Sequence, residues 1–242
     1  MDTPLVQDHK RAYVGDTGPN TGGMGSYSCA DHSLPFLSPH HVQEAKAINT
    51  AVAQALREET ADRYRGVLYG SFIATRDGIR VIEYNVRFGD PEVMNVLPLL
   101  KTDFLDICEA ILNETLHKIQ VAFDHKATVC KYAVPHGYPN PSAGRAPVDI
   151  EAIPKPSDRL RVYYAAIDRE QDVFYLTGSR AVAFVGIADT LEEAETIAEN
   201  AAAQSQAAGP LDHRKDIGTK SLIDQRIAHM KKIMAGKTGM VQ

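Results

Sequence analysis

Glu83-Tyr84-Asn85-Val86-Arg87-Phe88-Gly89-Asp90-Pro91-Glu92 is the stretch of sequence that decides the fold. It starts within Ile79–Asn85, a segment with the composition of a β-strand. The preceding Asp77-Gly78 pair is typical of a tight hairpin turn, so Gly66–Ala74 is predicted to be the partner strand. Side chains alternate between the two faces of a strand. One face is therefore expected to carry Ile79, Val81, Glu83 and Asn85.

The polar end of this strand has the composition of a metal site. Ile79 and Val81 are expected in the core, with Glu83 and Asn85 emerging where the sheet opens. A carboxylate and an amide oxygen side by side suit Mg²⁺, which completes its shell with water and nucleotide phosphates. Arg87 follows on the same side, where a guanidinium can stabilise charge on a transferring phosphoryl group or an acyl phosphate.

Two acidic residues beyond the turn, Asp90 and Glu92, are expected to hold Arg87 in place. The alternative is a solvated strand end followed by a Gly-Asp-Pro turn. A bare Glu-x-Asn-x-Arg pattern leaves the two interpretations evenly balanced, because so short a pattern recurs by chance. The full ten-residue run is far more specific and favours a catalytic site.

A glycine-rich segment, Asp16-Thr17-Gly18-Pro19-Asn20-Thr21-Gly22-Gly23-Met24-Gly25, is the second candidate. Four glycines and a proline within ten residues predict an irregular loop whose backbone amides can approach a ligand closely. The segment lacks the Gly-Lys-Ser/Thr of a Walker A loop and the spacing of a Rossmann fingerprint. A plain surface turn is the alternative. The pentad Gln7–Arg11 is a weaker candidate, because a polar run is usually a solvated face.

The remaining chain predicts an α+β protein. Helices are predicted from Ser38 with Pro39 in the first turn, over Thr102–Leu116, from the capping box of Thr190 and Glu193, and over Ser221–Met234. The Thr102–Leu116 helix is expected to bury Phe104, Ile107, Cys108, Ile111 and Leu112. Short β segments are predicted at Thr128–Val134, Leu160–Ile167, Val173–Leu176 and Arg180–Ile187. Ala235–Gln242 is expected to be a loose tail.

Composition excludes several classes of function. The 242 residues carry a net charge of −5, which gives no general attraction to nucleic acid or to anionic membranes. The three cysteines form no CxxC pair, so neither a disulfide framework nor a zinc knuckle is expected, and a reducing cytoplasm fits best. No apolar run is long enough to span a membrane, and the first residues do not resemble a signal peptide.

Taken in order, four segments resemble the second half of the glycinamide ribonucleotide synthetases, also called phosphoribosylamine–glycine ligases. They are Gln7–Arg11, Asp16–Gly25, Val81–Glu92 and the closing Arg214-Lys215-Asp216-Ile217-Gly218. The likeness runs from about residue 5 to residue 225. The resemblance implies the second half of an ATP-grasp catalytic domain over residues 1–124. A small mixed β/α carboxy-terminal domain is implied over residues 125–242.

The same resemblance implies a reaction in which ATP activates glycine as glycyl phosphate. The amine of 5-phosphoribosylamine then attacks, giving glycinamide ribonucleotide, ADP and phosphate. By matched position, Glu83 and Asn85 are expected to hold Mg²⁺ or Mn²⁺, and Arg87 to neutralise the acyl phosphate or a substrate anion. The Asp16–Gly25 loop, together with Arg87 and Asp90, is expected to bind the substrates. His9 and Lys10 are expected near the ATP phosphates.

The chain departs from the family pattern because the amino-terminal domain and the lid that clamps ATP precede the segment matching Gln7–Arg11. We therefore expect catalysis to need an amino-terminal half, whether this chain is a fragment, a truncated product or a split subunit. Two other interpretations stay open: a different ATP-grasp carboxylate–amine ligase, and a non-catalytic binding or assembly module that keeps the fold.

Overall fold

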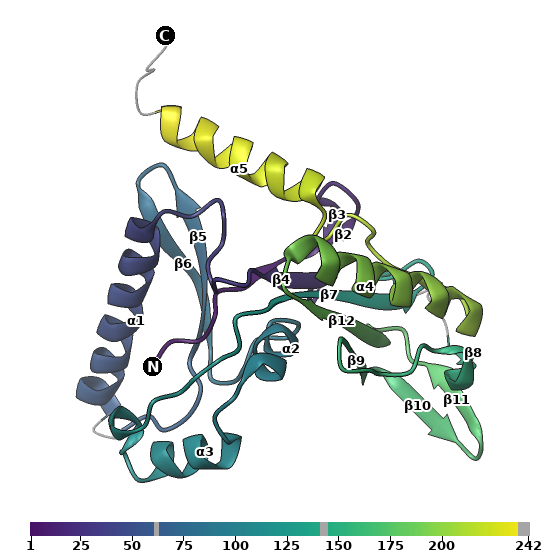
Figure 1. Ribbon diagram of the computed structural model, residues 1–242, viewed down its shortest axis with the longest axis horizontal. Coiled ribbons are helices and arrows are strands. Elements are labelled where there is room, and N and C mark those ends of the chain that lie inside the picture. Colours follow the sequence, from purple (N-terminus) through teal and green to yellow (C-terminus); the bar gives the residue numbers. More distant parts are fainter. Residues whose placement is uncertain (61–62, 141–144, 237–242) are drawn as a thin grey trace.

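The computed structural model describes residues 1–60, 63–140 and 145–236. The predicted tail Ala235–Gln242 falls largely outside these residues. Two groups of elements lie side by side, and helix α5 (Lys220–Ala235) runs from one group toward the other (Figure 1). The mixture of helices and antiparallel sheets is the predicted α+β class.

The larger group is built on one antiparallel sheet with the strand order β1-β4-β7-β12-β9, and β13 also pairs with β7. The strands are β1 (Gln7–Asp8), β4 (Gly25–Ser28), β7 (Ala127–Pro135), β9 (Leu160–Tyr164), β12 (Val182–Ala188) and β13 (Leu211–Asp212). Every residue of β7 is buried. A Cβ built on Gly186 of β12 would lie 2.0 Å from the carbonyl oxygen of Ala194, so this glycine lets the covering helix approach closely.

That covering helix is α4 (Leu191–Gln204), and it forms as the sequence predicts. The Thr190 hydroxyl accepts a hydrogen bond from the Glu193 N–H at 3.3 Å, which caps the first turn. The buried side chains are Ala194, Ala198, Ala201 and Ala202. Small residues on this face allow α4 to pack against β7 and β12, where the core of the protein lies.

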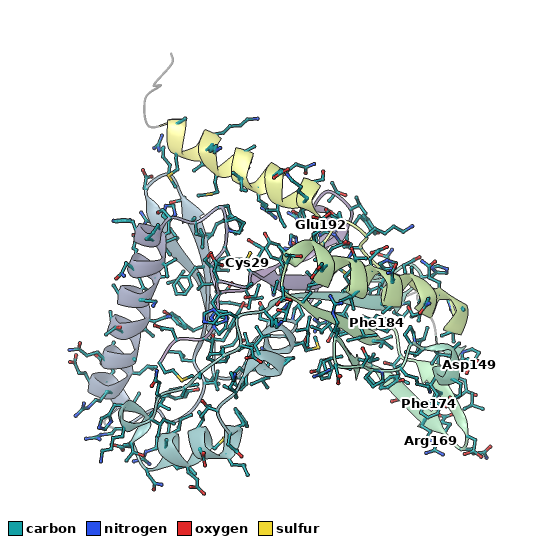
Figure 2. All side chains as sticks on the ribbon, in the orientation of Figure 1. Cys29, Asp149, Arg169, Phe174, Phe184 and Glu192 are labelled. Carbon is teal, nitrogen blue, oxygen red and sulfur yellow. The ribbon has the colours of Figure 1, made fainter. Side chains whose placement is uncertain are left out.

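A smaller three-stranded sheet extends this group. Its strands are β8 (Ala146–Val148), β10 (Ile167–Glu170) and β11 (Val173–Leu176), in the order β10-β11-β8. The predicted strand Leu160–Ile167 is therefore wrong in its extent, because β9 ends at Tyr164 and β10 begins at Ile167 in another sheet. Arg169 lies at the far end of this sheet, and Phe184 lies in the core beneath α4 (Figure 2).

The second group contains the predicted hairpin. Helix α1 (Pro39–Thr60) packs on one face of β5 (Tyr69–Thr75) and β6 (Gly78–Asn85). Thr75 pairs with Gly78, so the turn residues are Arg76 and Asp77 rather than Asp77 and Gly78. None of the residues of α1 is fully buried, so the packing of α1 on the hairpin covers the helix only in part.

A β-bulge changes which side chains share a face of β6. Phe72 pairs with Val81 but Ser71 pairs with Glu83, leaving Ile82 as an extra residue. The prediction that Ile79, Val81, Glu83 and Asn85 share a face is therefore wrong, because an extra residue inverts the alternation. Val81 is also 40% exposed rather than buried.

Helix α3 (Phe104–Leu112), preceded by the short α2 (Val93–Val96), is shorter and less buried than predicted. The Asp103 carboxylate caps it by accepting from the Leu105 N–H at 2.8 Å. Ile107 is buried, but Phe104 and Leu112 are 42% and 67% exposed, so their predicted burial is wrong. Exposed apolar side chains also occur on the hairpin group at Ile73, Ile82 and Val86.

The predicted division at residue 124 stays a prediction, but one sheet draws strands from both sides of it. β4 pairs with β7 over Gly25–Ser28, and β1 pairs with β4. Any unit ending at residue 124 would therefore share its sheet with the following unit. Over the described residues, no helix combines the length and apolar composition that crossing a membrane requires.

Candidate functional site

The predicted metal pair lies on the face of the hairpin opposite α1. The Tyr84 hydroxyl donates to Asn49 Oδ1 of α1 at 2.8 Å, so Tyr84 faces the helix. Because neighbouring side chains in a strand point to opposite faces, Glu83 and Asn85 point away from α1. Tyr69 is the cross-strand partner of Asn85 and shares that face. The structure thus brings the two predicted oxygen ligands to one surface.

A charged group converges beside this pair. The Tyr69 hydroxyl donates to the buried carboxylate of Glu92. Lys10 Nζ lies 2.8 Å from Asp8 Oδ2. Although partial burial opposes it, the hydrogen bond and charge of Asp8, with the charges of Glu92 and Glu83, raise the pKa of Lys10. Lys10 is therefore a cation held among three carboxylates, next to the predicted metal ligands.

Asp8 is a largely buried carboxyl of this cluster with a raised pKa. Burial, and then the charge of Glu92, raise the pKa of Asp8 to about 6, although Lys10 opposes the shift. The pentad Gln7–Arg11 is therefore more than a solvated face, because Asp8 is only 12% exposed and lies inside the charged group.

Arg87 does not make the contacts that the sequence predicts. Its side chain is exposed, and its Nη1 donates to the Phe88 carbonyl oxygen at 2.7 Å. Asp90 binds Arg180 instead, and Glu92 binds Tyr69. The prediction that these two carboxylates hold Arg87 is wrong, because other partners occupy both.

The glycine-rich segment is more regular than predicted. Thr17–Asn20 forms strand β3, which pairs with β2 (Arg11–Tyr13) as an exposed hairpin. The irregular parts are Asp16, in the turn between β2 and β3, and residues 21–24 between β3 and β4. Met24 at the end of the second part is 2% exposed, and its N–H donates to the His9 carbonyl oxygen at 2.8 Å. The described contacts of Met24 favour packing over the predicted substrate contact.

The turn at Gly22 and Gly23 reaches the charged group. Gly23 has φ of +116°, and a Cβ there would lie 2.8 Å from Asp8 Oδ1 and 2.6 Å from Pro91 Cδ. Glycine is required at this position because both the backbone angle and the space exclude a side chain. The close approach places the turn directly against Asp8.

Asp16 is the centre of a separate ionic network that fixes the base of the glycine-rich segment. Its Oδ1 accepts from Arg214 Nη1 at 2.8 Å and from His9 Nδ1 at 3.2 Å, and its Oδ2 accepts from Arg226 at 2.5 Å. Burial opposes ionisation, but these donors hold the pKa of Asp16 well below its usual range. Asp216 accepts from Arg214 and from the Gly15 N–H at 2.9 Å.

His9 belongs to this network. Burial lowers the pKa of His9, and its Nδ1 lies 3.2 Å from Asp16 Oδ1, where a ring N–H can donate to the carboxylate. Its side chain has no exposed surface. These contacts favour a structural role for His9 over the predicted contact with ATP, whereas Lys10 remains accessible.

The structure adds three residues that motif reasoning missed as parts of the site: Tyr69, Arg180 and Arg214. Arg214 lies in the closing motif Arg214–Gly218, which pointed to the family but did not predict what Arg214 contacts. Arg180 stands in no motif. Tyr69 could have been found by pairing the two strands, since it lies across from Asn85.

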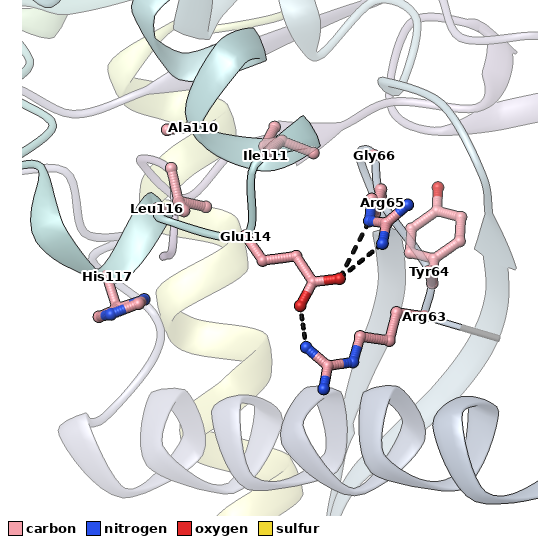
Figure 3. A pocket seen from close by; sticks show the side chains of 9 residues that line it. All are labelled: Arg63, Tyr64, Arg65, Gly66, Ala110, Ile111, Glu114, Leu116 and His117. Atoms are coloured by element: carbon pink, nitrogen blue, oxygen red, sulfur yellow. Dashed lines mark hydrogen bonds and ion pairs between the residues drawn. The ribbon is translucent and has the colours of Figure 1, made fainter. Parts of the chain in front are cut away.

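A separate hollow of about 260 Å³ lies beside α3, away from the predicted ligands. Arg63 and Arg65 both bind Glu114 there (Figure 3). The hollow contains none of the predicted site residues. Within the described residues, no group of three or more His, Cys, Asp or Glu side chains could hold a metal ion by itself. A metal at Glu83 and Asn85 would therefore take the rest of its ligands from water and substrate.

Solved enzyme structures share the fold of the chain. The chain superposes on phosphoribosylamine–glycine ligase from Thermotoga maritima with a TM-score of 0.71 at 24% identity, covering 88% of this chain and 51% of that one. It superposes on the biotin carboxylase domain of Hydrogenobacter thermophilus 2-oxoglutarate carboxylase with a TM-score of 0.55 at 15% identity, covering 86% and 42%. At these identities the likeness establishes the fold alone.

Sequence comparison identifies the family. The ATP-grasp (A) domain of phosphoribosylglycinamide synthetase matches residues 1–93, and the C domain of the same family matches residues 128–220. The chain belongs to the phosphoribosylglycinamide synthetase family. It is 53% identical to the phosphoribosylamine–glycine ligases of Methanocaldococcus jannaschii and Methanosarcina acetivorans. Each alignment covers 96% of this chain, so the chain spans about half the length of these relatives, 51% and 52%.

Proposed function

We propose that this chain supplies the metal-binding and substrate-binding half of an ATP-dependent ligase that joins glycine to 5-phosphoribosylamine. The glycine carboxylate takes the γ-phosphoryl group of ATP and releases ADP. The amine of phosphoribosylamine then attacks the acyl carbon of glycyl phosphate, and phosphate leaves as glycinamide ribonucleotide forms. Family membership supports the reaction. The observation that carries it is the convergence of Glu83, Asn85 and Lys10 on one surface.

The donor set at the strand end fits Mg²⁺ or Mn²⁺. Glu83 and Asn85 offer hard oxygen ligands from one face of a paired strand, and they leave most coordination positions for phosphate oxygens and water. A divalent cation bound there would neutralise negative charge on the ATP phosphates. Holding only two protein ligands suits a cation that arrives with its nucleotide.

The remaining side chains have separate tasks in this proposal. Lys10, kept protonated by Asp8, binds a phosphate oxygen as a point charge. Arg87 is exposed and makes only a backbone contact among the described residues, so its guanidinium is available to an acyl phosphate. The Gly22–Gly23 turn, lying against Asp8, lines the substrate side. Asp90 acts through Arg180 rather than through Arg87.

An amino-terminal half would complete the nucleotide site. One face of the β5–β6 hairpin is covered by α1, while apolar side chains stay exposed in the hairpin group. Ile82 and Val86 are 61% and 74% exposed beside the metal pair. A two-stranded sheet is marginal by itself. We infer that the remainder of the enzyme packs on this surface and encloses ATP, as the half-length alignments suggest.

The test measures phosphate release from ATP with glycine and phosphoribosylamine, using this chain with and without a supplied amino-terminal half. We expect turnover only in the complete enzyme and only with both substrates. Glu83→Gln or Asn85→Ala should abolish it without changing the unfolding transition, because neither side chain packs in the core. Glu192→Gln is the control, since Glu192 is an exposed glutamate on α4 (Figure 2).

Two outcomes would contradict the proposal. One is phosphate release by the complete enzyme that does not depend on glycine, which would indicate another carboxylate substrate. The other is normal turnover in Glu83→Gln with an unchanged Mg²⁺ dependence, which would remove the metal site from the strand end.

A further inference from the structure

Arg180 lies in the loop before β12, within the segment matched by the C domain, yet it contacts the Gly22–Gly23 turn and Asp90, which follows the predicted metal ligands in sequence. Its Nη1 and Nη2 each lie 3.1 Å from one carboxylate oxygen of Asp90, a bidentate pair. Nη1 also donates to the carbonyl oxygens of Gly22 and Gly23, at 3.1 and 3.2 Å. One guanidinium therefore joins three segments that are distant in sequence.

The guanidinium is itself held in place. It stacks over the Tyr132 ring at 4.6 Å from the ring centroid, and the Tyr132 hydroxyl donates to Asp90 Oδ1 at 3.0 Å. Tyr132 belongs to the buried strand β7. The Arg180 side chain is only 16% exposed. Its position is thus fixed by an aromatic face, a carboxylate and two carbonyl groups together.

Among the described residues, Arg180 is the recorded donor to the Gly22 and Gly23 carbonyl oxygens. The amides of the turn have other partners: the Gly23 N–H donates to Thr21 Oγ1 at 3.0 Å and the Met24 N–H to the His9 carbonyl oxygen at 2.8 Å. A Cβ built on Gly22 would lie 3.0 Å from Arg180 Cζ, so the turn and the guanidinium are in direct contact. On its other side the turn touches Asp8, which pairs with Lys10. The turn therefore lies between Arg180 and the charged group beside the predicted metal ligands.

We propose that Arg180 is a positioning residue: it sets the conformation of the Gly22–Gly23 turn and, through that turn, the affinity for substrate. The substrate part rests on the proposed ligase function, but the conformational part does not. Lysine cannot replace arginine here, because an ammonium makes neither the bidentate pair nor the planar stack. Charge alone is therefore insufficient at this position.

The test compares Arg180→Lys with Arg169→Lys. Arg169 has a similar set of partners, with Asp172 at 3.0 Å, the Gln171 carbonyl oxygen at 2.9 Å and the Phe174 ring at 5.6 Å, but at the far end of the small sheet. Hydrogen exchange is measured at the amides of Gly23 and Met24. We expect exchange there to rise about tenfold or more in Arg180→Lys, the factor expected for losing a hydrogen bond to a charged group. Arg169→Lys should not change it.

The second measurement is steady-state kinetics in the complete enzyme. Arg180→Lys should raise the KM of glycine or phosphoribosylamine about tenfold, with the Mg²⁺ concentration for half-maximal rate unchanged. A merely structural arginine would instead lower the unfolding midpoint and leave KM unchanged. Gly22→Ala serves where Arg180→Lys does not fold, because its methyl group would lie 3.0–3.2 Å from the guanidinium and push it by a few tenths of an ångström while Asp90 and Tyr132 stay intact.

Each result decides a separate point. Unchanged exchange at Gly23 and Met24 in both Arg180→Lys and Gly22→Ala would overturn the positioning role, whatever the ligase assay gives. Faster exchange with unaltered KM would overturn the link to substrate affinity. No glycine-dependent turnover in the unmodified complete enzyme would refute the proposed function, while the exchange data would still decide whether Arg180 holds the turn.

Discussion

Asp16→Asn is the substitution whose effect on folding the structure predicts most directly. It removes the charge that faces Arg214, which is 1% exposed, and Arg226. Removing one partner of a buried ion pair costs about 3–5 kcal/mol. Because Asp216 still binds Arg214 and Asp16 is 23% exposed, we expect the free energy of unfolding to fall by about 2–3 kcal/mol at pH 7.

Urea denaturation followed by circular dichroism measures this change. With a slope of about 3 kcal/mol per molar urea for a chain of this size, the midpoint should fall by about 1 M. Asp172→Asn is the matched control, because Asp172 also pairs with an arginine at 3.0 Å but is 96% exposed. We expect the control to change the free energy by less than about 0.5 kcal/mol.

The pH dependence gives a second check. The pKa of Asp16 is lower in the folded protein than in the unfolded chain, so the stability from its charge is complete above about pH 4 and declines as pH falls below that value. The difference between wild type and Asp16→Asn should therefore narrow by about 1 kcal/mol between pH 7 and pH 3. A midpoint shift under about 0.3 M, or a difference that does not change with pH, would refute the role of Asp16 as an ionic centre.

Three further predictions concern the charged group and the nucleotide. Arg87→Lys should lose most of its kcat in the complete enzyme, since an ammonium cannot make two parallel hydrogen bonds to a phosphate; near-normal kcat would make Arg87 dispensable for the chemistry. The chain without an amino-terminal half should bind MgATP weakly in calorimetry and show no ligase turnover, because water would reach the acyl phosphate; micromolar affinity with turnover would contradict this. The pKa of Asp8 is about 6 in the folded protein and lower in the unfolded chain, so ionisation of Asp8 destabilises the wild type as pH rises. The free energy of unfolding of Asp8→Asn, minus that of the wild type, should therefore rise by up to about 3 kcal/mol between pH 4 and pH 6. A difference that does not change with pH would show that the pKa of Asp8 is not raised by folding.

Local sequence predicted the helices and strands well, but it predicted less well which side chains share a face of a strand. The hairpin, α4 and its Thr190 cap follow from periodicity and capping, which depend on neighbouring residues. The bulge at Ile82 did not, because nothing in the strand's own sequence distinguishes a regular ladder from one with an extra residue. Because the bulge was not predicted, Glu83 and Asn85 were expected on the same face of the hairpin as Ile79, whereas they lie on the opposite face.

The site could be predicted where its residues belong to one stretch of sequence, but not where the interacting residues are far apart in the sequence. Glu83 and Asn85 are two residues apart, so their pairing needs only a strand. Asp90 was given the wrong arginine because Arg87 is near in sequence, whereas Arg180, 90 residues away, is near in space. Similarly, the ionic network of Asp16 could not be predicted from its neighbours in sequence, because its partner Arg214 is 198 residues away.

These long-range contacts give the carboxy-terminal segment a definite physical task. The glycine-rich segment has two fixed points: its base is held by Asp16 and its turn by Arg180. Both fixed points use arginines that follow residue 124, and strand β4 after the turn pairs with β7. Ordering a segment with four glycines in ten residues costs conformational entropy, because glycine loses more conformational freedom on folding than other residues. The carboxy-terminal segment offsets that cost through charged contacts to Asp16, Asp90 and the turn, while Lys10 stays 44% exposed and, in the proposed function, remains open together with Glu83 and Asn85 to a nucleotide.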